Sequence, residues 1–535
     1  MKPLCLLVLL AVQGSSQSGV DSTGEAGSQA CAACHREISR RYASTGMAQS
    51  SGRIGEGTFK ESFAHATFAD ARTGAVYRVA PADGGFRLGF SREETGVRGE
   101  RVLSWFAGSG RVGRSYFFSL DGFLFQSPVS YYTQTAEWDV SPGFQRFARI
   151  YLTRDVEPGC LQCHASRLQP VAGTRNGYRN PPFLEGGVAC ERCHGPGKQH
   201  IASVRAGKGI GTIVNPAKLA GARRESVCAQ CHLTGAARIA RRRAKSDTFR
   251  PSELLGDYSA FFVWADSGAA MKVTSHFERL AQSRCKRASG DKMWCGSCHD
   301  VHGSVTQDAQ SYRARCERCH AVSACKAPRE NRAKLNDDCV SCHMPKSPVR
   351  DAEHSVYTDH SIPRIAGAPR RPTPEAGGEL VPFWSQAPDP RDLGLAYAAV
   401  GDDDRAAPLL EAAQKRDSGD VAVLQQLAQI YDRRGETEQA VSLYQRILRM
   451  DQTEVAARVN LASIYARRGR SAEAIALWKA ALARDPGLTG ARSDLAVVEY
   501  RSGDRQAAEA SLREALTMDP DDPTARRLLD EIRQR

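Results

Sequence analysis

Seven copies of the pattern Cys-x-x-Cys-His occur within the first 343 residues of the chain. Two thiols one helical turn apart can form thioethers to the two vinyl groups of a haem, and the adjacent imidazole then reaches the iron. The pattern therefore predicts seven covalently attached haem c groups, each with its motif histidine as proximal ligand. The seven motifs are Cys31-Cys34-His35, Cys160-Cys163-His164, Cys190-Cys193-His194, Cys228-Cys231-His232, Cys295-Cys298-His299, Cys316-Cys319-His320 and Cys339-Cys342-His343.

Zinc binding and dithiol redox chemistry are the competing interpretations of Cys-x-x-Cys. Structural zinc sites pair two such hooks, or one hook with a distant histidine pair, and do not need histidine directly after every second cysteine. A thioredoxin-like dithiol calls for one motif rather than seven. Because every pair here is followed at once by histidine, haem attachment is the favoured interpretation.

The histidines outside the motifs are candidate distal ligands of the irons. There are seven predicted irons but only six such imidazoles, so Met47, twelve residues after His35, is a seventh candidate ligand. The alternative is that the Met47 side chain only fills space in the core. An iron left without a distal side chain would be open to a small ligand. The histidine candidates are His65, His200, His276, His302, His354 and His360.

His200 and His302 follow their own motifs so closely that each is expected to serve a neighbouring haem. Three cysteines lie outside the motifs: Cys5, in the N-terminal segment 1–19 that is expected to be removed as a signal peptide, and Cys285 and Cys325, whose even number predicts a disulfide in an oxidising compartment.

Residues 1–19 resemble a secretory signal peptide, with Lys2 before the apolar run Leu4–Val12 and small polar residues after it. The expected location is therefore the periplasm or another exported compartment. No apolar run reaches the roughly 18 residues that span a bilayer, so no transmembrane segment is predicted.

The formal net charge of +13 belongs entirely to the motif-bearing part of the chain. Residues 1–386 contain 51 basic and 35 acidic residues, whereas residues 387–535 contain 22 and 25. Seven haems would bring about 14 propionate charges, so the basic excess is expected to balance the cofactor. The Arg-rich stretch 238–245 is accordingly interpreted as a solvated face or a propionate partner, and no nucleic-acid partner is predicted.

The organisation along the chain follows from changes in pattern. Residues between Thr58 and Tyr132 alternate apolar and polar with turn signals, which predicts antiparallel hairpins. The predicted segments are a signal peptide at 1–19, a first haem-binding segment at 20–56, a β-rich insert at 57–150, a six-haem region at 151–362, a proline-rich linker at 363–386, and four repeats with a capping helix at 387–535.

A 34-residue period governs the C-terminal part. Gly401, Gly435, Gly469 and Gly503 repeat at this spacing, each with alanine five residues later, and Asp417, Asp451, Asp485 and Asp519 keep the same period. This is the period of tetratricopeptide repeats, whose paired helices stack into a solenoid with a groove for a peptide or protein. A rigid spacer is the alternative role.

With these motifs, the chain resembles periplasmic multihaem cytochromes c of the nitrifier-type cytochrome c-554 family, fused to tetratricopeptide repeats. The residues that carry the likeness are 190–200, 295–302 and 339–346. The resemblance implies closely packed, mostly bis-histidine haems that carry electrons, with His200, His302, His354 and His360 as distal ligands. The expected fold is multidomain and mainly α: a seven-haem domain with little regular structure and an antiparallel β insert, then a helical solenoid.

The predicted function is electron transfer between a redox donor and an acceptor protein, with the repeats docking a protein partner. The alternative is an oxidoreductase that acts on a small nitrogen or sulfur compound at one five-coordinate haem. No catalytic residue is assigned, and the carrier is favoured over the enzyme.

Overall fold

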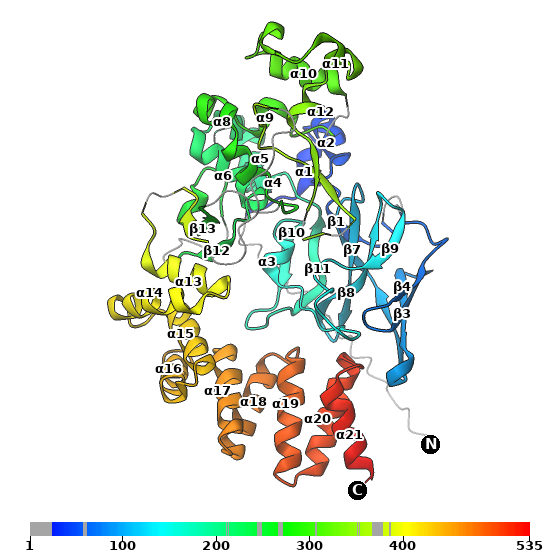
Figure 1. Ribbon diagram of the computed structural model, residues 1–535, viewed down its shortest axis with the longest axis vertical. Helices are drawn as coiled ribbons and strands as arrows, with labels where there is room; N and C mark the ends of the chain where they lie inside the picture. Colours follow the sequence, from blue (N-terminus) through cyan, green and yellow to red (C-terminus); the bar gives the residue numbers. More distant parts are fainter. Residues whose placement is uncertain are drawn as a thin grey trace, which may run out of the picture.

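The computed structural model describes residues 24–534 except 57–60, 210, 212, 243–248, 266–270, 305–307, 350, 353, 366–377 and 385–386. The predicted signal peptide and much of the predicted linker lie outside these residues. Figure 1 shows an elongated molecule: the motif-bearing region occupies the upper part, the β insert lies beside it, and the repeats form the lower part. The fold is thus mixed, with several sheets, rather than mainly α.

The first haem-binding segment and the β insert together form two antiparallel sheets. One sheet has the strand order β1-β6-β7-β8-β9, and the other has the order β2-β3-β4-β5. Their strands and the two preceding helices are α1 (Ser28–Ala32), α2 (Arg36–Ala43), β1 (Ser51–Arg53), β2 (Thr67–Asp70), β3 (Ala75–Ala82), β4 (Gly85–Arg92), β5 (Val97–Leu103), β6 (Trp105–Ala107), β7 (Gly113–Leu120), β8 (Phe123–Tyr132) and β9 (Glu137–Val140).

The hairpins expected from the alternating pattern are confirmed. Strands β3 and β4 pair across the turn at Asp83-Gly84, and β7 and β8 pair across Asp121-Gly122. Inward-facing aromatic residues of both sheets, among them Phe86 and Tyr116, form one core. The insert therefore has a side-chain core of its own.

The motif-bearing region after the insert has short helices and small sheets. Figure 1 shows α10 and α11 at its outer end, far from the repeats. Its elements are α3 (Pro158–Leu161), β10 (Ala165–Pro170), β11 (Tyr178–Gly186), α4 (Glu191–His194), α5 (Lys198–Arg205), α6 (Gly221–His232), β12 (Ala237–Ala240), β13 (Ser259–Trp264), α7 (His276–Gln282), α8 (Arg284–Ser289), α9 (Cys295–Cys298), α10 (Ala309–Glu317), α11 (Arg329–Lys334), α12 (Cys339–His343), β14 (Lys346–Pro348), β15 (Val356–Thr358) and β16 (Leu380–Pro382).

The C-terminal region is a solenoid of paired helices, as the period predicts. Each repeat glycine has a positive φ, between 73° and 88°, where the first helix of its pair ends, and glycine takes this conformation without a Cβ penalty. The pairs are α13 (Pro390–Ala399) with α14 (Asp403–Arg416), α15 (Val421–Arg433) with α16 (Thr437–Met450), α17 (Val455–Arg467) with α18 (Ser471–Arg484), and α19 (Thr489–Arg501) with α20 (Arg505–Met518), followed by α21 (Pro523–Gln534).

Both ends of the solenoid share a core with the rest of the molecule. At its start, Phe262 of β13 and Leu380 of β16 belong to the same apolar cluster as the first helices. The end of the predicted linker is therefore a strand, paired with β13. At the far end, Met518 of α20 joins the core of the β insert. The repeats thus pack against the motif-bearing region at one end and against the β insert at the other.

The turns between successive repeats supply the polar part of this contact. Asp417 pairs with Arg242, Asp485 accepts a hydrogen bond from the backbone of Arg175 at 3.0 Å, and Asp519 binds Arg149 through two hydrogen bonds of 2.8 and 2.6 Å. Three of the four aspartates with the 34-residue period therefore face the body of the protein. The contacts between the solenoid and the rest of the protein therefore recur along one edge with the same 34-residue period as the repeats.

Replacing Arg149 with alanine is expected to lower the free energy of unfolding by roughly 2–4 kcal/mol, because Asp519 is 3% exposed and would lose its cation. Urea denaturation followed by circular dichroism measures this loss. The matched control is Arg513→Ala, which removes an exposed pair with Glu509 on α20 and is expected to leave the urea midpoint unchanged. Equal effects of the two substitutions would contradict the docking role of Arg149.

Candidate haem-binding sites

Each attachment motif lies on or beside one turn of helix, which sets the spacing of its side chains. In four motifs the backbone N–H of the histidine donates to the carbonyl of the first cysteine at 2.9 to 3.0 Å: His35, His194, His299 and His320. A closed turn of this kind puts residues three apart on one face. The two thiols and the imidazole of a motif therefore face the same side, as thioether attachment and iron ligation require.

Cysteines of different motifs lie close together. Each of four thiols contacts a thiol from another motif at hydrogen-bonding range: Cys31 with Cys190, Cys163 with Cys231, Cys228 with Cys295, and Cys316 with Cys339. None of the sixteen cysteines in the described part of the chain forms a disulfide. The attachment sites are thus neighbours in space although they are spread over more than three hundred residues.

Three motif histidines face a second histidine from elsewhere in the chain. The ring centres lie 5.9 Å apart for His194 and His302, 5.6 Å for His232 and His276, and 6.1 Å for His299 and His360. Two imidazoles bound on opposite sides of one metal by bonds of about 2 Å have ring centres about 6 Å apart. These three pairs therefore have the separation of axial ligands.

In five of these six histidines, burial lowers the pKa and so favours the neutral imidazole, which is the form that binds a metal. It lowers the pKa of His276 to about 3 and that of His299 to about 4, and in both the nearby His360 adds to the effect. Burial also lowers the pKa of His232, although this side chain keeps an exposed surface.

Backbone carbonyls orient several of the rings. His194 Nδ1 lies 2.7 Å from the carbonyl oxygen of Val214, and His343 Nδ1 lies 2.8 Å from that of Pro363. When Nδ1–H donates to a carbonyl, Nε2 is left as the ligand atom, and the ring is fixed in direction. The structure thus presents Nε2 of both motif histidines for iron binding.

The motif-bearing region lacks the side chains that would fill a core. Among the described residues of 278–348, which hold the last three motifs, no hydrophobic residue is buried; the nearest are Phe277 and Val349. In addition, Nδ1 of His164, His200 and His276 is buried without a hydrogen-bond partner in the described structure. Large apolar groups with polar contacts are what this region would need, and haem fits both requirements.

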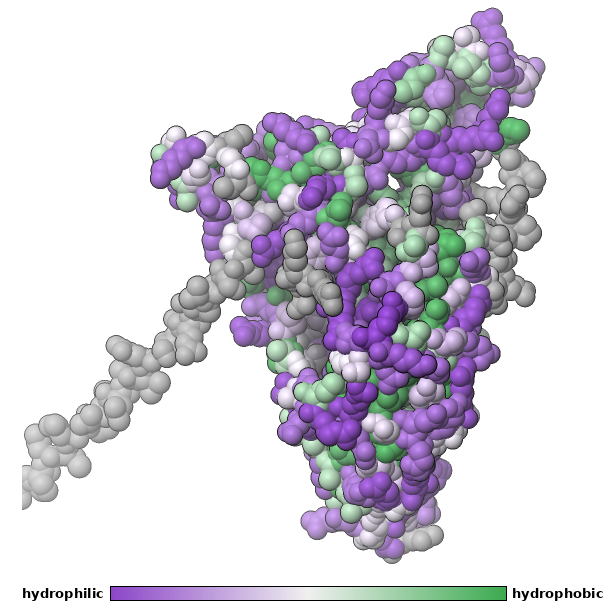
Figure 2. Space-filling view, turned by 90° about the vertical axis from the view of Figure 1, so that its left-hand side faces the viewer, coloured by the Kyte–Doolittle hydropathy of each residue, from purple (hydrophilic) through white to green (hydrophobic). Residues whose placement is uncertain are grey.

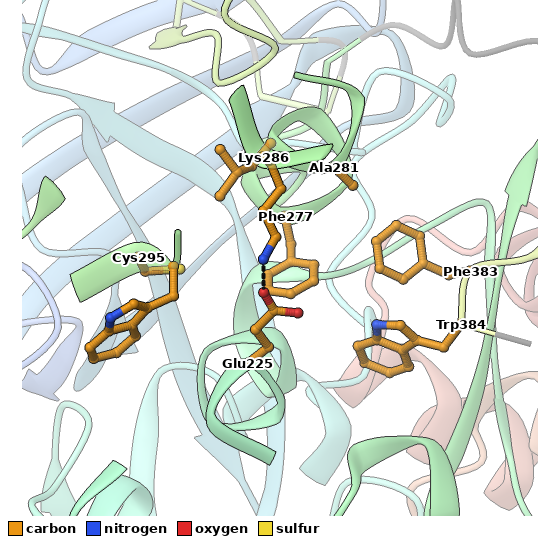
Figure 3. A pocket seen from close by; sticks show the side chains of 9 residues that line it. Glu225, Phe277, Ala281, Lys286, Cys295, Phe383 and Trp384 are labelled. Atoms are coloured by element: carbon orange, nitrogen blue, oxygen red, sulfur yellow. Dashed lines mark hydrogen bonds and ion pairs between the residues drawn. The ribbon is translucent and has the colours of Figure 1, made fainter. Parts of the chain in front are cut away.

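A cavity of about 210 Å³ lies beside Cys295 of the fifth motif. Figure 3 shows Phe383 and Trp384 on one side, Cys295 on the other, and the ion pair of Lys286 with Glu225 between them. An apolar wall next to an attachment cysteine suits a porphyrin edge. In contrast, no three His, Cys, Asp or Glu side chains converge as a metal-ion site within the described ranges.

Several predicted ligands do not lie opposite a motif histidine. His65 is exposed on the loop before β2. His354 Nε2 lies 2.8 Å from Asp139 Oδ2, and its ring packs against Tyr132, so it belongs to the face of the β insert. The backbone carbonyl of Met47 accepts a hydrogen bond from Val188 N–H, and no contact of its thioether with His35 is recorded in the described structure.

Cys285 and Cys325, for which a disulfide is expected, are not bonded to each other in the described structure. Cys325 is exposed, whereas Cys285 Sγ lies 3.9 Å from Nε2 of His320, the histidine of the sixth motif.

Glu191, inside the third motif, is a structural residue that the sequence interpretation did not single out. Its buried carboxylate accepts hydrogen bonds from the backbone N–H groups of Ala26 at 2.7 Å, Gly27 at 2.9 Å and Gly197 at 2.7 Å. It therefore joins the first haem-binding segment to the third motif. The acidic residue within the motif was visible in the sequence, but nothing local indicates its distant partners.

Arg279 and Asp359 were also missed. The guanidinium of Arg279 on α7 binds the Asp359 carboxylate through hydrogen bonds of 2.9 and 2.7 Å, both in buried positions. Although burial opposes ionisation, the hydrogen bonds from Arg279 and Ser361 hold the pKa of Asp359 at about 2. Because His276 starts α7 and His360 follows Asp359, this ion pair sets the positions of two distal candidates.

Comparison with known proteins agrees with this geometry. Residues 134–195 match the family described as cytochrome c554 and c-prime, and residues 391–454, 426–489 and 465–532 match tetratricopeptide repeats. The chain joins a cytochrome c554-like region to tetratricopeptide repeats. Covalently bound haem c is thus the cofactor, and multihaem electron transfer together with protein interaction are the functions to which these families point.

Relatives and solved structures cover only parts of the chain. The multiheme cytochrome MtrA of Shewanella baltica (strain OS185) is 27% identical over 218 residues, which are 38% of this chain and 56% of MtrA. The chain thus spans about half the length of this relative. Among solved structures, MamA AMB-1 is 24% identical, over 27% of this chain and 79% of its own, with a TM-score of 0.26. A tetratricopeptide repeat protein from Parabacteroides merdae ATCC 43184 is 20% identical, over 27% and 59%, with a TM-score of 0.25.

No helix in the described part of the chain has the length and apolar character needed to cross a membrane.

Proposed function

We propose that the chain is an exported, periplasmic cytochrome that carries electrons between two redox proteins through seven covalently attached haem c groups. The observation that carries this proposal is the continuity of contacts among the seven motifs. The predicted segments, from the signal peptide at 1–19 to the repeats at 387–535, are part of the same proposal.

The contacts link all seven motifs into one connected set. Thiol contacts join the first motif to the third, the second to the fourth, the fourth to the fifth, and the sixth to the seventh. The facing rings of His194 and His302 join the third motif to the loop after the fifth. Arg315 on α10 donates a hydrogen bond to the carbonyl of Cys298, which joins the fifth motif to the sixth. Each haem attached to this connected set of motifs would therefore lie near at least one other haem, as electron transfer from haem to haem requires.

Haem c supplies reversible one-electron transfer between ferric and ferrous iron. The protein would hold each group through two cysteines and a proximal histidine, and backbone carbonyls fix the rings of two of these histidines, His194 and His343. We assign His302 as the distal ligand opposite His194, His276 opposite His232, and His360 opposite His299. His200, with a buried and unpartnered Nδ1, remains a candidate for another iron.

Replacing His302 with alanine is expected to remove one low-spin ferric haem of the seven and to produce a high-spin signal of the same intensity, because one iron loses an axial imidazole. Electron paramagnetic resonance of the oxidised holoprotein measures this change. His65→Ala is the matched control and is expected to leave the spectrum unchanged, since His65 is exposed on its loop. An unaltered His302→Ala spectrum would contradict the assignment.

One observation favours the alternative, an oxidoreductase acting on a small nitrogen or sulfur compound. His65 and His354 lie away from the motif histidines, so four of the six candidate imidazoles remain for seven irons. A pyridine haemochrome count with electron paramagnetic resonance separates the two functions. Seven haems, all low-spin, support the carrier, whereas a high-spin ferric signal that shifts with nitrite or cyanide supports the enzyme.

The repeats would serve this function by holding the redox region in place and by docking a protein partner. Figure 2 shows one face of the molecule, on which hydrophilic side chains dominate and apolar ones form small patches. The shared cores at both ends of the solenoid support the holding role.

A further inference from the structure

Cys285 lies beside the imidazole of the sixth motif. This residue is on α8, and its Sγ is 3.9 Å from Nε2 of His320. A metal bound in line between a thiolate at about 2.3 Å and an imidazole nitrogen at about 2.0 Å separates the two ligand atoms by about 4.3 Å. The observed separation of 3.9 Å is close to that value. In the same way, the ring-centre distances of the three histidine pairs are close to the distance expected for two imidazoles on one metal.

No imidazole takes this position in the described structure. His276, His302 and His360 face other motif histidines, His354 is held by Asp139, and no ring contact between His320 and another histidine occurs among the described residues. Cys285 forms no disulfide with Cys325 in the described structure. The group facing His320 is therefore a sulfur that no other bond occupies.

The charges around Cys285 suit an anionic ligand. Arg284, Lys286 and Arg287 flank it on α8, and of these Lys286 is already paired with Glu225 while Arg284 and Arg287 are exposed. Cationic side chains offset the negative charge that a thiolate adds beside the iron.

We propose that Cys285 is the distal ligand of the haem attached at Cys316, Cys319 and His320, so that this haem has an imidazole–thiolate pair. The proposal rests on the haem attachment proposed above. On binding, the thiol loses its proton to water, the sulfur–iron bond forms, and no electron is transferred. An anionic sulfur ligand stabilises ferric over ferrous iron, so this haem has a lower reduction potential than its bis-imidazole neighbours.

The test compares the oxidised full-length holoproteins of the wild type, Cys285→Ala and Cys325→Ala. The wild type is expected to show a low-spin component with the narrow g-value spread and near-infrared magnetic circular dichroism band of a thiolate-ligated haem, from one haem in seven. Cys285→Ala loses this component, gains an equal high-spin signal, and has one haem in seven that titrates at a higher potential. Cys325→Ala retains the wild-type spectrum.

Two further measurements keep the outcome decisive. Cys285→His restores a low-spin haem with a bis-imidazole spectrum, which distinguishes lost ligation from a misfolded variant. A pyridine haemochrome count of six, with Cys316 and Cys319 unmodified by peptide mass, contradicts haem attachment itself and with it the ligand. If the haem count is seven and the Cys285→Ala spectrum matches the wild type, only the ligand proposal is overturned. The same conclusion follows if both alanine variants cause the same change and the wild type lacks two free thiols, because Cys285 and Cys325 would then form a disulfide.

Discussion

Serine substitution of the six cysteines in the fifth, sixth and seventh motifs is expected to leave residues 278–348 unfolded while the β insert and the solenoid remain folded. Ordering a backbone costs about 1–2 kcal/mol per residue, and no buried hydrophobic side chain among the described residues of this segment offsets that cost. The insert and the solenoid have apolar cores of their own. Haem attached at the three motifs would therefore be the main source of apolar burial in the segment.

Hydrogen exchange followed by mass spectrometry measures this effect peptide by peptide. Amides within 278–348 should lose their protection, whereas those of β3–β8 and α14–α20 should keep it. The matched control is Cys325→Ser, which changes an exposed cysteine of the same segment that belongs to no motif, and it should retain full protection. Protection of 278–348 in the six-fold serine variant would show that side chains alone fold this segment.

Replacing Glu191 with alanine is expected to detach the first haem-binding segment from the third motif and to lower the free energy of its local unfolding by at least about 3 kcal/mol. Glu191 is 5% exposed and accepts three backbone hydrogen bonds. Each hydrogen bond to a charged group contributes about 1.5–3 kcal/mol, and the N–H groups left behind would be largely without partners. Glu191→Gln, which keeps one acceptor oxygen, should have an intermediate effect.

Limited trypsin digestion at increasing concentrations of urea measures this local unfolding. Trypsin cleaves after Arg36, Arg40 and Arg41, which lie in the segment that would be released. The matched control is Glu37→Ala, which removes an exposed carboxylate paired with Arg40 and should leave the digestion midpoint unchanged. If Glu191→Ala digests like the wild type, the carboxylate does not hold the two segments together.

The attachment chemistry and the repeat architecture could be predicted from the sequence because both depend on short or periodic spacing. The thioether geometry of Cys190-Cys193-His194 requires only one helical turn, and the turn at Gly435 requires only a residue that tolerates a positive φ. The β hairpins were equally local. An even count of cysteines, in contrast, carries no information about distance: Cys285 Sγ lies 3.9 Å from Nε2 of His320 and is not bonded to Cys325 in the described structure.

Contacts between distant segments could not be predicted in this way. His302 was expected to serve a neighbouring haem, but the sequence does not indicate which one, and the ring of His194 opposite it is a result of the fold. Likewise, the 34-residue spacing of Asp417, Asp485 and Asp519 predicts repeats, but it does not indicate that these carboxylates contact the rest of the molecule.

By itself, therefore, the sequence determined which residues can attach haem c, how many attachment motifs there are, and where the solenoid begins and repeats, since bond geometry within one turn of helix dictates each of these. Only the tertiary structure decided which imidazole or thiol faces which motif histidine, which motifs are neighbours, and that the solenoid is anchored at both ends. Those relations depend on segments far apart in the chain, and their burial against one another, rather than any local preference, brings them together.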